Sequence, residues 1–567
     1  MRILLFFLSL LLGTALLQAQ TPSFVWVKAL YGPNNTTSSA TQVRALDTDA
    51  QGNTYLCGDF ENTLNLGSGI QTDAAGTQKA NFVAKYSPQG VPLWIRSIRH
   101  VNPSPGSAFT SISMSTDAAG NVYCAGNYFA NSLDFGNGTT LNRTCTNQCT
   151  EGFLVKYSSN GDLVFVKGLR AATGLAFEVA GIAADDAGNH YISGTFAGSE
   201  LWLQGGANIG GLESSGYYLA KYKENGQSEW TTFVNPGSAI PNPNGIAVSP
   251  DGTRIAVCGQ SASATVQFGN GVSVPGNAQG QPFIVVYSNT SHAQYAGLLS
   301  SSGIVNLGAI QINTENQVLA SVQFNGNLKW QDVSQGNYNG SDVANHVLRI
   351  DQNGASSLTG NIIHTPSTFP VGRIAAGQGG KWFAGGSAGN AISVPGTGDF
   401  PSQGCTDVLV IGGQDAQVQW GRRVGQGCEE SNIFQHQTLL GAGPNGEVMM
   451  AGAFTNSANF NGIGFAGSGL WVGKLSSQMV DASEISATPA AVELSPNPVS
   501  DQLHLKFQTP ENGILQIRDQ TGRLVLYSLI NAHSMDVGVQ EWPKGIYFLS
   551  YMTSKGQRPV CQPFLVQ

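Results

Sequence analysis

The chain has 567 residues, of which 72 are glycine and only 11% are charged, and its formal net charge is −8. This composition is typical of a turn-rich, all-β protein and excludes a long helical or a disordered chain. The acidic balance provides no basic surface for a phosphate backbone or an anionic lipid, so we expect no nucleic-acid partner.

Residues 1–19 are predicted to be a secretory signal peptide. Arg2 precedes an apolar run from Ile3 to Leu12, and the small residue Ala19 ends a cleavage site before Gln20. No later apolar run reaches the length of about 18 residues that a membrane-spanning helix needs. We therefore expect export of a mature chain that starts at Gln20, without membrane insertion.

A repeat organises residues 20–479. It occurs seven times at spacings of 63 to 68 residues, measured at the equivalent positions Gly58, Gly126, Gly194, Gly259, Val322, Gly386 and Gly452. Each copy has four short runs of β-branched and aromatic residues bounded by Gly, Asn, Asp and Ser, which indicates four antiparallel strands. Such units must bury their faces against one another, and seven of them predict a seven-bladed β-propeller.

The two ends of the repeat region predict how the ring closes. The seventh copy lacks a fourth strand, because the chain runs from its third strand into Val480-Asp-Ala-Ser-Glu. Residues 24–30 precede the first copy and resemble a fourth strand, with Trp26 placed 68 residues before Trp94. We therefore expect the N-terminal strand to complete the seventh blade beside the strand that contains Trp471.

Every repeat carries a variable insertion between its second and third strands. Most insertions begin with a short strand-like piece, such as Leu64-Asn-Leu66, so we expect part of each to extend the blade and the rest to form one rim. Variable rims are where repeat proteins place their binding chemistry. Trp202 and Trp330 lie in two insertions and are the candidate ligand-binding residues; they could stack on sugar rings or pack the blade extensions, and packing is favoured.

The cysteines predict disulfides and no metal site. Two pairs are candidates in an oxidising compartment, Cys145 with Cys149 and Cys405 with Cys428. Three others lie inside second strands and are interpreted as small buried apolar residues: Cys57, Cys124 and Cys258. The eight histidines are scattered without metal-ligand spacing, so we expect neither a metal nor a cofactor.

No catalytic residue is predicted from the motifs. Gly385-Gly-Ser-Ala-Gly389 satisfies the nucleophile-elbow pattern around Ser387, but it lies inside a strand with no helix behind it. Asp49, Asp117 and Asp185 recur at equivalent turns in successive repeats. A catalytic group is needed once, so this recurrence indicates a role in folding.

The composition changes after Met479. Residues 480–492 are rich in alanine and lack aromatic residues, which indicates a linker. Residues 493–567 contain five strand-like runs with turn residues between them, which predict a small β-sandwich. The fold class is therefore all-β throughout, with a propeller followed by a smaller second domain.

Two resemblances add to this interpretation. The motif from Phe82 to Trp94 resembles the SBBP repeat of bacterial seven-bladed propellers, over residues 24–479. The tail resembles the type A C-terminal sorting domain of the type IX secretion system of Bacteroidetes, which implies transport of a folded cargo across the outer membrane. The sorting motif is carried by Pro496, Asn497, Pro498, Asp519, Gly522, Arg523, Gly545 and Tyr547.

These observations predict an exported binding protein, located at the outer-membrane surface or secreted after passing through the periplasm. Its expected partners are the type IX secretion machinery and an extracellular protein or glycan, and we expect a monomer. The alternative is a secreted glycoside hydrolase or polysaccharide lyase, which would need paired carboxylates near the ring axis. Ionisable side chains that converge there would favour the enzyme, whereas a pocket lined by glycine and neutral polar groups would favour binding.

Overall fold

The computed structural model describes residues 22–32, 41–74, 79–101, 108–145, 149–171, 177–206, 209, 216–234, 240–260, 265–276, 280–338, 343–365, 373–388, 392–394, 398–400, 407–424, 438–454, 457–460, 463–476, 492–507, 513–519, 524–530, 533–553 and 560–567. The chain divides into two compact units, residues 1–479 and 480–567. Strands are the regular elements of the described residues in both units.

In its described residues the first unit contains seven antiparallel sheets, one for each repeat, and each has four core strands; three sheets have only these four, and insertion strands extend the others to five or six. Within each sheet the strands neighbour one another in sequence order, apart from the seventh. The strands, from first to fourth, are β2 (Gln42–Thr48), β3 (Thr54–Phe60), β6 (Ala80–Tyr86) and β7 (Pro92–His100) in repeat one; β8 (Ala108–Thr116), β9 (Val122–Phe129), β12 (Glu151–Tyr157) and β13 (Leu163–Ala171) in repeat two; β14 (Phe177–Ala184), β15 (His190–Phe196), β17 (Gly216–Tyr222) and β18 (Ser228–Val234) in repeat three; β19 (Ile240–Val248), β20 (Arg254–Gln260), β23 (Pro282–Ser288) and β24 (Ala293–Ser300) in repeat four; β25 (Val305–Ile312), β26 (Val318–Phe324), β29 (Val343–Ile350) and β30 (Ser356–Thr365) in repeat five; β31 (Arg373–Ala376), β32 (Lys381–Ala388), β35 (Asp407–Gln414) and β36 (Gln417–Val424) in repeat six; and β37 (Leu439–Ala442), β38 (Val448–Phe454), β41 (Gly469–Leu475) and β1 (Phe24–Leu30) in the seventh sheet.

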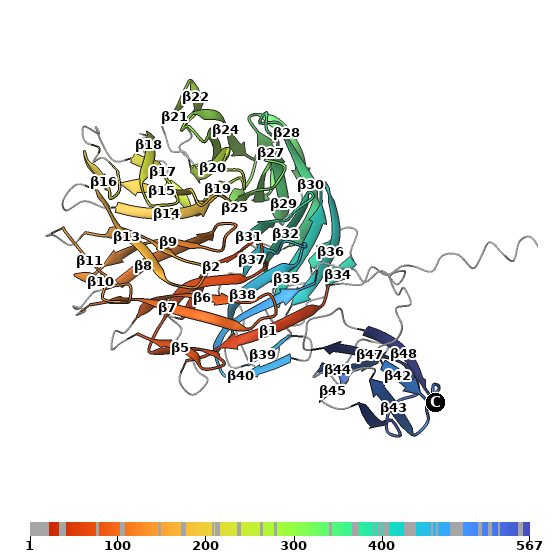
Figure 1. Cartoon of the computed structure of the whole chain (residues 1–567). Coiled ribbons are helices and arrows are strands. Elements are labelled where there is room, and N and C mark those ends of the chain that lie inside the picture. The colour runs from red at the N-terminus through yellow and green to blue at the C-terminus, as the bar shows by residue number, and fades with distance from the viewer. Residues whose placement is uncertain are drawn as a thin grey trace, which may run out of the picture. The chain divides into compact units, whose positions relative to one another are not determined.

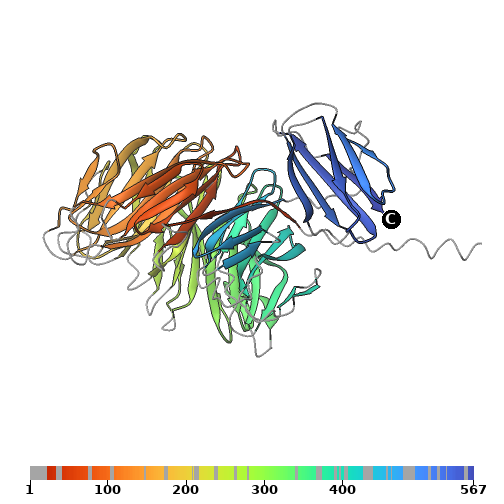
Figure 2. The same ribbon diagram turned by 90° about the horizontal axis from the view of Figure 1, so that it is seen from below.

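The sheets form a closed ring. The first strand of each sheet contacts the first strand of the next, from β2 through β8, β14, β19, β25 and β31 to β37, and β37 contacts β2 again. Figures 1 and 2 show this succession in the colour order of the chain. Each sheet is therefore a blade of a β-propeller, with its first strand innermost.

The N-terminal strand closes the ring as predicted. β1 pairs antiparallel with β41, and Ala29 lies opposite Trp471 while Trp26 lies opposite Lys474. In Figure 1 the red strand β1 accordingly lies beside the blue strands of the last repeat. The N-terminal strand thus supplies the fourth strand that the seventh repeat lacks.

The hydrophobic core lies between adjacent blades. Second and third strands such as β3 and β6 are buried along their whole length, because neighbouring blades cover both of their faces. One core cluster joins Trp26, Leu30 and Leu470 of the seventh blade to Leu56 and Phe82 of the first. Each joint therefore buries apolar surface from two blades, which is the main stabilising contribution in such a ring.

In the described residues, four of the seven insertions extend the preceding blade rather than their own, which corrects the prediction. β10 (Ser132–Asp134), in the insertion of repeat two, pairs with β7 of blade one. The same arrangement places β16 (Leu201–Leu203) on β13, β27 (Gly326–Trp330) on β24, and β33 (Ile392–Val394) on β30. The fourth strand offers a free row of backbone hydrogen-bonding groups, and the next insertion occupies it.

The remaining insertion strands complete short hairpins. They are β4 (Thr63–Gly67) with β5 (Ile70–Asp73), β11 (Thr140–Asn142) with β10, β21 (Val266–Gly269) with β22 (Val272–Val274), β28 (Val333–Tyr338) with β27, β34 (Gly398–Phe400) with β33, and β39 (Ser457–Phe460) with β40 (Ile463–Ala466).

The second unit is a β-sandwich of two sheets around one core. One sheet has the order β42 (Val492–Ser495), β43 (Gln502–Phe507), β46 (Ser534–Gly538); the other has the order β45 (Leu524–Ile530), β44 (Gly513–Asp519), β47 (Gly545–Thr553), β48 (Val560–Val566). Leu503, Leu505, Ile517 and Leu549 are fully buried between them. The five predicted runs are strands, and β42 and β46 were not predicted.

Candidate functional site

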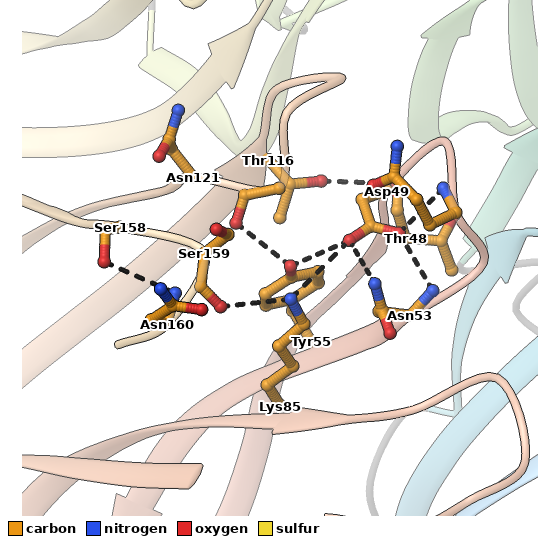
Figure 3. A network of polar contacts seen from close by, with 12 residues as sticks. Thr48, Asp49, Asn53, Tyr55, Lys85, Thr116, Asn121, Ser158, Ser159 and Asn160 are labelled. Atoms are coloured by element: carbon orange, nitrogen blue, oxygen red, sulfur yellow. Dashed lines mark hydrogen bonds and ion pairs between the residues drawn. The ribbon is translucent and has the colours of Figure 1, made fainter. Parts of the chain in front are cut away.

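The recurring aspartates cap turns and join neighbouring blades. The carboxylate of Asp49 accepts hydrogen bonds from the backbone N–H of Asn53 (2.9 Å), the side-chain amide of Asn53 (2.7 Å) and the Tyr55 hydroxyl (2.8 Å) (Figure 3). The same hydroxyl lies 3.0 Å from the carbonyl oxygen of Gly120 in blade two. Burial and the nearby Asp49 charge raise the pKa of Tyr55 well above its usual range, so it stays protonated.

The next repeats carry the same arrangement. Asp117 accepts from Asn121 and from the Tyr123 hydroxyl, and Asp185 accepts from Asn189. Since the contacts repeat in three successive blades, these aspartates hold the turns of blades one to three, as the sequence indicated.

A second set of contacts between blades was not predicted. The indole N–H of Trp94 donates to the carbonyl of Ser159 in the next blade (3.1 Å), and Lys85 donates to the same oxygen (3.0 Å). Trp26 donates to Pro88 (2.9 Å) and Trp230 to Asn289 (2.8 Å) at the equivalent turns of the following blades. The sequence held a signal for these contacts. A tryptophan recurs at a spacing of 68 residues, and the four-residue turn that accepts its N–H recurs in the next repeat.

The ring axis holds an apolar collar. An axial cavity of about 100 Å³ is lined by one equivalent residue from the first strand of every repeat. In each repeat this residue lies three positions before the first residue of the turn that follows the strand. The collar residues are Leu46, Met114, Ile182, Ile246, Ile310, Ile374 and Leu440. Seven large apolar side chains therefore converge on the axis from all seven blades.

Four polar residues also line the axial cavity: Arg44, Ser113, Gln311 and Arg373. Arg44 and Arg373 come from blades one and six, and burial lowers the pKa of Arg373 to about 10. The described residues that line the cavity include no Asp or Glu. Ionisable side chains therefore converge near the axis, the feature expected to favour the enzyme, but both are arginines. They suit an anionic group, and the described lining residues offer no pair of carboxylates for acid and base catalysis.

A larger cavity of about 340 Å³ lies at the closure of the ring. It is lined by residues of β1, of β4 and of the segments that follow them, including Lys28, Tyr31, Asn65 and Ser68. The backbones of Tyr31 and Asn65 bond to each other there, at 3.1 and 2.8 Å. This cavity is formed by the contact that closes the ring.

The two candidate tryptophans differ in accessibility. Trp330 is only 2% exposed, and its indole N–H donates to the carbonyl of Gly354 (3.0 Å). It packs the blade extension, the alternative that the sequence favoured. Trp202 is half-buried on β16, where the Arg170 guanidinium lies 4.2 Å from its ring and Glu200 accepts its N–H (3.2 Å). These neighbours occupy one face and the polar edge of the Trp202 ring.

One predicted disulfide is present. Cys145 and Cys149 are bonded in the insertion of repeat two, and buried Glu151 accepts hydrogen bonds from the N–H groups of Thr144 (3.0 Å) and Cys145 (2.9 Å). Cys405 and Cys428 lie outside the described residues. The predicted buried thiols are fully buried: Cys57, Cys124 and Cys258. Ser387 lies in strand β32, with no helix after it in the described residues.

The described sorting-motif residues lie in or beside the strands of the second unit. The side-chain oxygen of Asn497, between Pro496 and Pro498, accepts from the N–H of Leu565 (3.0 Å). Tyr547 is 2% exposed and donates its hydroxyl proton to Pro543 (2.7 Å). Asp519 ends β44 and Gly545 begins β47, whereas Gly522 and Arg523 lie outside the described residues. Asn497 therefore contacts the last strand, and Tyr547 bonds to the segment just before its own strand.

Comparisons with known proteins agree with the division of the chain into two units. The first unit has the fold of a β-propeller, and residues 493–560 match the family described as the secretion system C-terminal sorting domain. That domain directs export through type IX secretion to the cell surface or the extracellular space. The matched segment does not include the repeats, so the resemblance to SBBP propellers stays a prediction. No curated protein matches the sequence.

Several solved structures are similar at low identity. PorZ, an essential bacterial surface component of the type-IX secretion system of Porphyromonas gingivalis, shares 10% identity over 94% of this chain and 100% of that chain, with a TM-score of 0.22. The intramolecular trans-sialidase from Ruminococcus gnavus shares 9% identity over 83% and 100%, with a TM-score of 0.31. A subtype N11 neuraminidase-like protein from a flat-faced bat virus (H18N11) shares 10% identity over 81% and 96%, with a TM-score of 0.31.

Within the described residues, no helix is long and apolar enough to cross a membrane. The same part of the chain contains no group of three or more His, Cys, Asp or Glu side chains that could hold a metal ion.

Proposed function

We propose that the protein is an exported binding protein that holds an extracellular protein or glycan at the insertion rim and the adjoining mouth of the axial cavity. The single observation that carries this proposal is the lining of that cavity. Apolar collar residues and two arginines converge there, and the described lining residues include no carboxylate. A glycosidase of the common type needs two carboxylates on opposite sides of the scissile bond.

The insertions support the rim as the binding surface. They are the most variable segments of the repeats, and β10, β16, β27 and β33 anchor their first parts on the preceding blade. A fixed base with variable tips is the arrangement that repeat proteins use to vary a binding surface without disturbing the core.

The test combines binding and turnover. The mature protein is applied to a glycan array and to a panel of surface proteins, and the same preparation is assayed for release of reducing ends from polysaccharides. We expect binding without product. Steady product formation would overturn the proposal in favour of a hydrolase or lyase.

Export has a separate test. Deletion of residues 493–567 should leave the propeller folded, because the two units have their own cores, and should trap it in the periplasm. Glu541→Ala, an exposed position in the same unit, serves as the matched control and should be exported. Secretion of the truncated chain at the normal rate would contradict the role assigned to the tail.

A further inference from the structure

The two axial arginines lie on the same side of the apolar collar. Arg44 precedes collar residue Leu46 by two positions, and Arg373 directly precedes Ile374. In each blade the first strand runs toward the turn that follows it, and the antiparallel second strand returns to the end where the insertion begins. Both residues therefore lie on the insertion-rim side of the collar residues along their strands.

Arg44 is fixed by contacts along one edge of its guanidinium. Its Nε and Nη2 atoms both approach Oδ2 of Asp59, at 2.8 and 2.7 Å. Asp59 is itself held by the side-chain amide of Asn81 (2.7 Å) and by Lys79 (3.4 Å). These contacts leave Nη1 of Arg44 unused, and its side chain is 38% exposed. A rigid, accessible guanidinium edge is suited to an anion, because little side-chain entropy is lost on binding.

Arg373 supplies a second cation to the cavity lining from blade six, which only blade seven separates from blade one. Burial lowers the pKa of its guanidinium to about 10, which still leaves it protonated at neutral pH. A cation that has lost part of its hydration attracts an anion more strongly than one in bulk water. Among the described residues that line the cavity, the two charged side chains are both cations, Arg44 and Arg373, so the cavity favours a negative group.

The collar limits what can enter. Its apolar side chains form the floor below the arginines, and the cavity of about 100 Å³ has room for roughly three water molecules at about 30 Å³ each. A carboxylate with its neighbouring carbon atoms fits this space, whereas the rest of a larger ligand would lie outside on the rim. The apolar floor also excludes water from one side of the anion.

We propose that the axial cavity binds the carboxylate group of the ligand, held between Arg44 and Arg373. This inference rests on the proposed binding function and names its chemistry. The carboxylate can belong to a uronic acid of a glycan or to an acidic side chain of a protein, and both present the same planar anion to the two guanidinium groups.

The test measures binding of D-glucuronate, N-acetyl-L-aspartate and neutral D-glucose to the mature protein by calorimetry or ligand-observed NMR. We expect at least one carboxylate to bind and glucose not to bind. Arg44→Gln and Arg373→Gln should each weaken carboxylate binding about tenfold or more, since a charge-assisted hydrogen bond contributes about 1.5–3 kcal/mol. Lys223→Gln, which removes an exposed cation on the turn rim, is the matched control and should leave binding unchanged.

A further variant avoids the loss of a buried group. Ser113→Asp places a carboxylate on the cavity wall and leaves both arginines in place, so it should abolish binding of either acid while thermal unfolding stays normal. Whichever acid binds more tightly identifies the source. Equal binding of glucose, or carboxylate binding that survives both arginine substitutions, would overturn the inference.

The outcome separates this inference from the proposed function. Glycan or protein binding that persists in Arg44→Gln and Arg373→Gln would support the rim as a binding surface and refute the axial carboxylate site. Loss of array binding in both variants, with a normal fold, would support the two together.

Discussion

Replacing Trp26 by alanine should loosen the closure of the ring. Trp26 lies on β1, which belongs to blade seven, yet its indole N–H bonds to Pro88 and its ring packs on Gly90, both in blade one. A Cβ atom added at Gly90 would come within 2.5 Å of the indole, which shows how closely the two meet. The side chain is only 7% exposed, so truncation removes about 3–5 kcal/mol of packing and hydrogen bonding.

The matched control is Trp94→Ala. Trp94 has the same exposure of 7% and the same type of hydrogen bond, to Ser159 of the next blade. Its strand, however, is part of the continuous hairpin of β6 and β7, whereas β1 has no such hairpin partner in blade seven. Loss of Trp26 should therefore allow β1 to separate from β41, whereas loss of Trp94 should leave β7 paired with β6.

The assay is native-state hydrogen exchange followed by mass spectrometry. In Trp26→Ala, exchange in residues 24–30 and 469–475 should accelerate by up to about a thousandfold, because about 4 kcal/mol less is needed for local opening. Trp94→Ala should change exchange mainly near its own turn. Trp26→Phe keeps an aromatic side chain but removes the N–H. It should therefore show only the loss of stability due to the hydrogen bond, about 1 kcal/mol.

Two results would refute this reasoning. If both alanine variants accelerated exchange equally in residues 24–30, Trp26 would have no special role in closure. If Trp26→Ala left exchange in β41 unchanged, the N-terminal strand would not protect that strand.

Two further predictions concern buried groups. His190 is fully buried among the rings of Tyr123, Tyr222 and Phe165, and burial lowers its pKa to about 3. The neutral imidazole contributes fully to the free energy of unfolding above the unfolded pKa near 6.5, and this contribution is lost as pH falls toward 3. His190→Phe should therefore reduce the loss of stability between these pH values in denaturant titrations. An unchanged loss would contradict the assignment. The Cys145–Cys149 bond closes a short loop and should contribute about 2 kcal/mol in the loop-entropy model; Cys145→Ser with Cys149→Ser should speed exchange in residues 140–151, and no change there would show that Glu151 alone holds the loop.

The architecture was predictable because it repeats. Trp26 could be matched to Trp94 by spacing alone, and that match places β1 beside β41. Asp49 and its equivalents could be assigned to folding because a recurring residue faces the same surroundings in each blade. The turns that accept the tryptophan N–H groups also recur in the sequence. The hydrogen bond itself could not be predicted, because it depends on where the next blade lies.

The candidate site was not predictable in the same way. Arg44 and Arg373 occupy different positions in their repeats and share no motif, so only closure of the ring brings them to one cavity. The insertions were expected to extend their own blades, but hydrogen bonding to the open edge of the preceding blade determined their place. The choice of the edge with which an insertion strand pairs left no periodic signal in the sequence.

The attachment of four insertions to the preceding blade also bears on self-association. An uncovered outermost strand is a template on which another copy of a β-rich chain can add, and exported proteins meet one another without cytoplasmic chaperones. In β7, β13, β24 and β30 part of that template is already occupied by a segment of the same molecule. The loops that diversify the rim thereby also guard the periphery of the ring against aggregation.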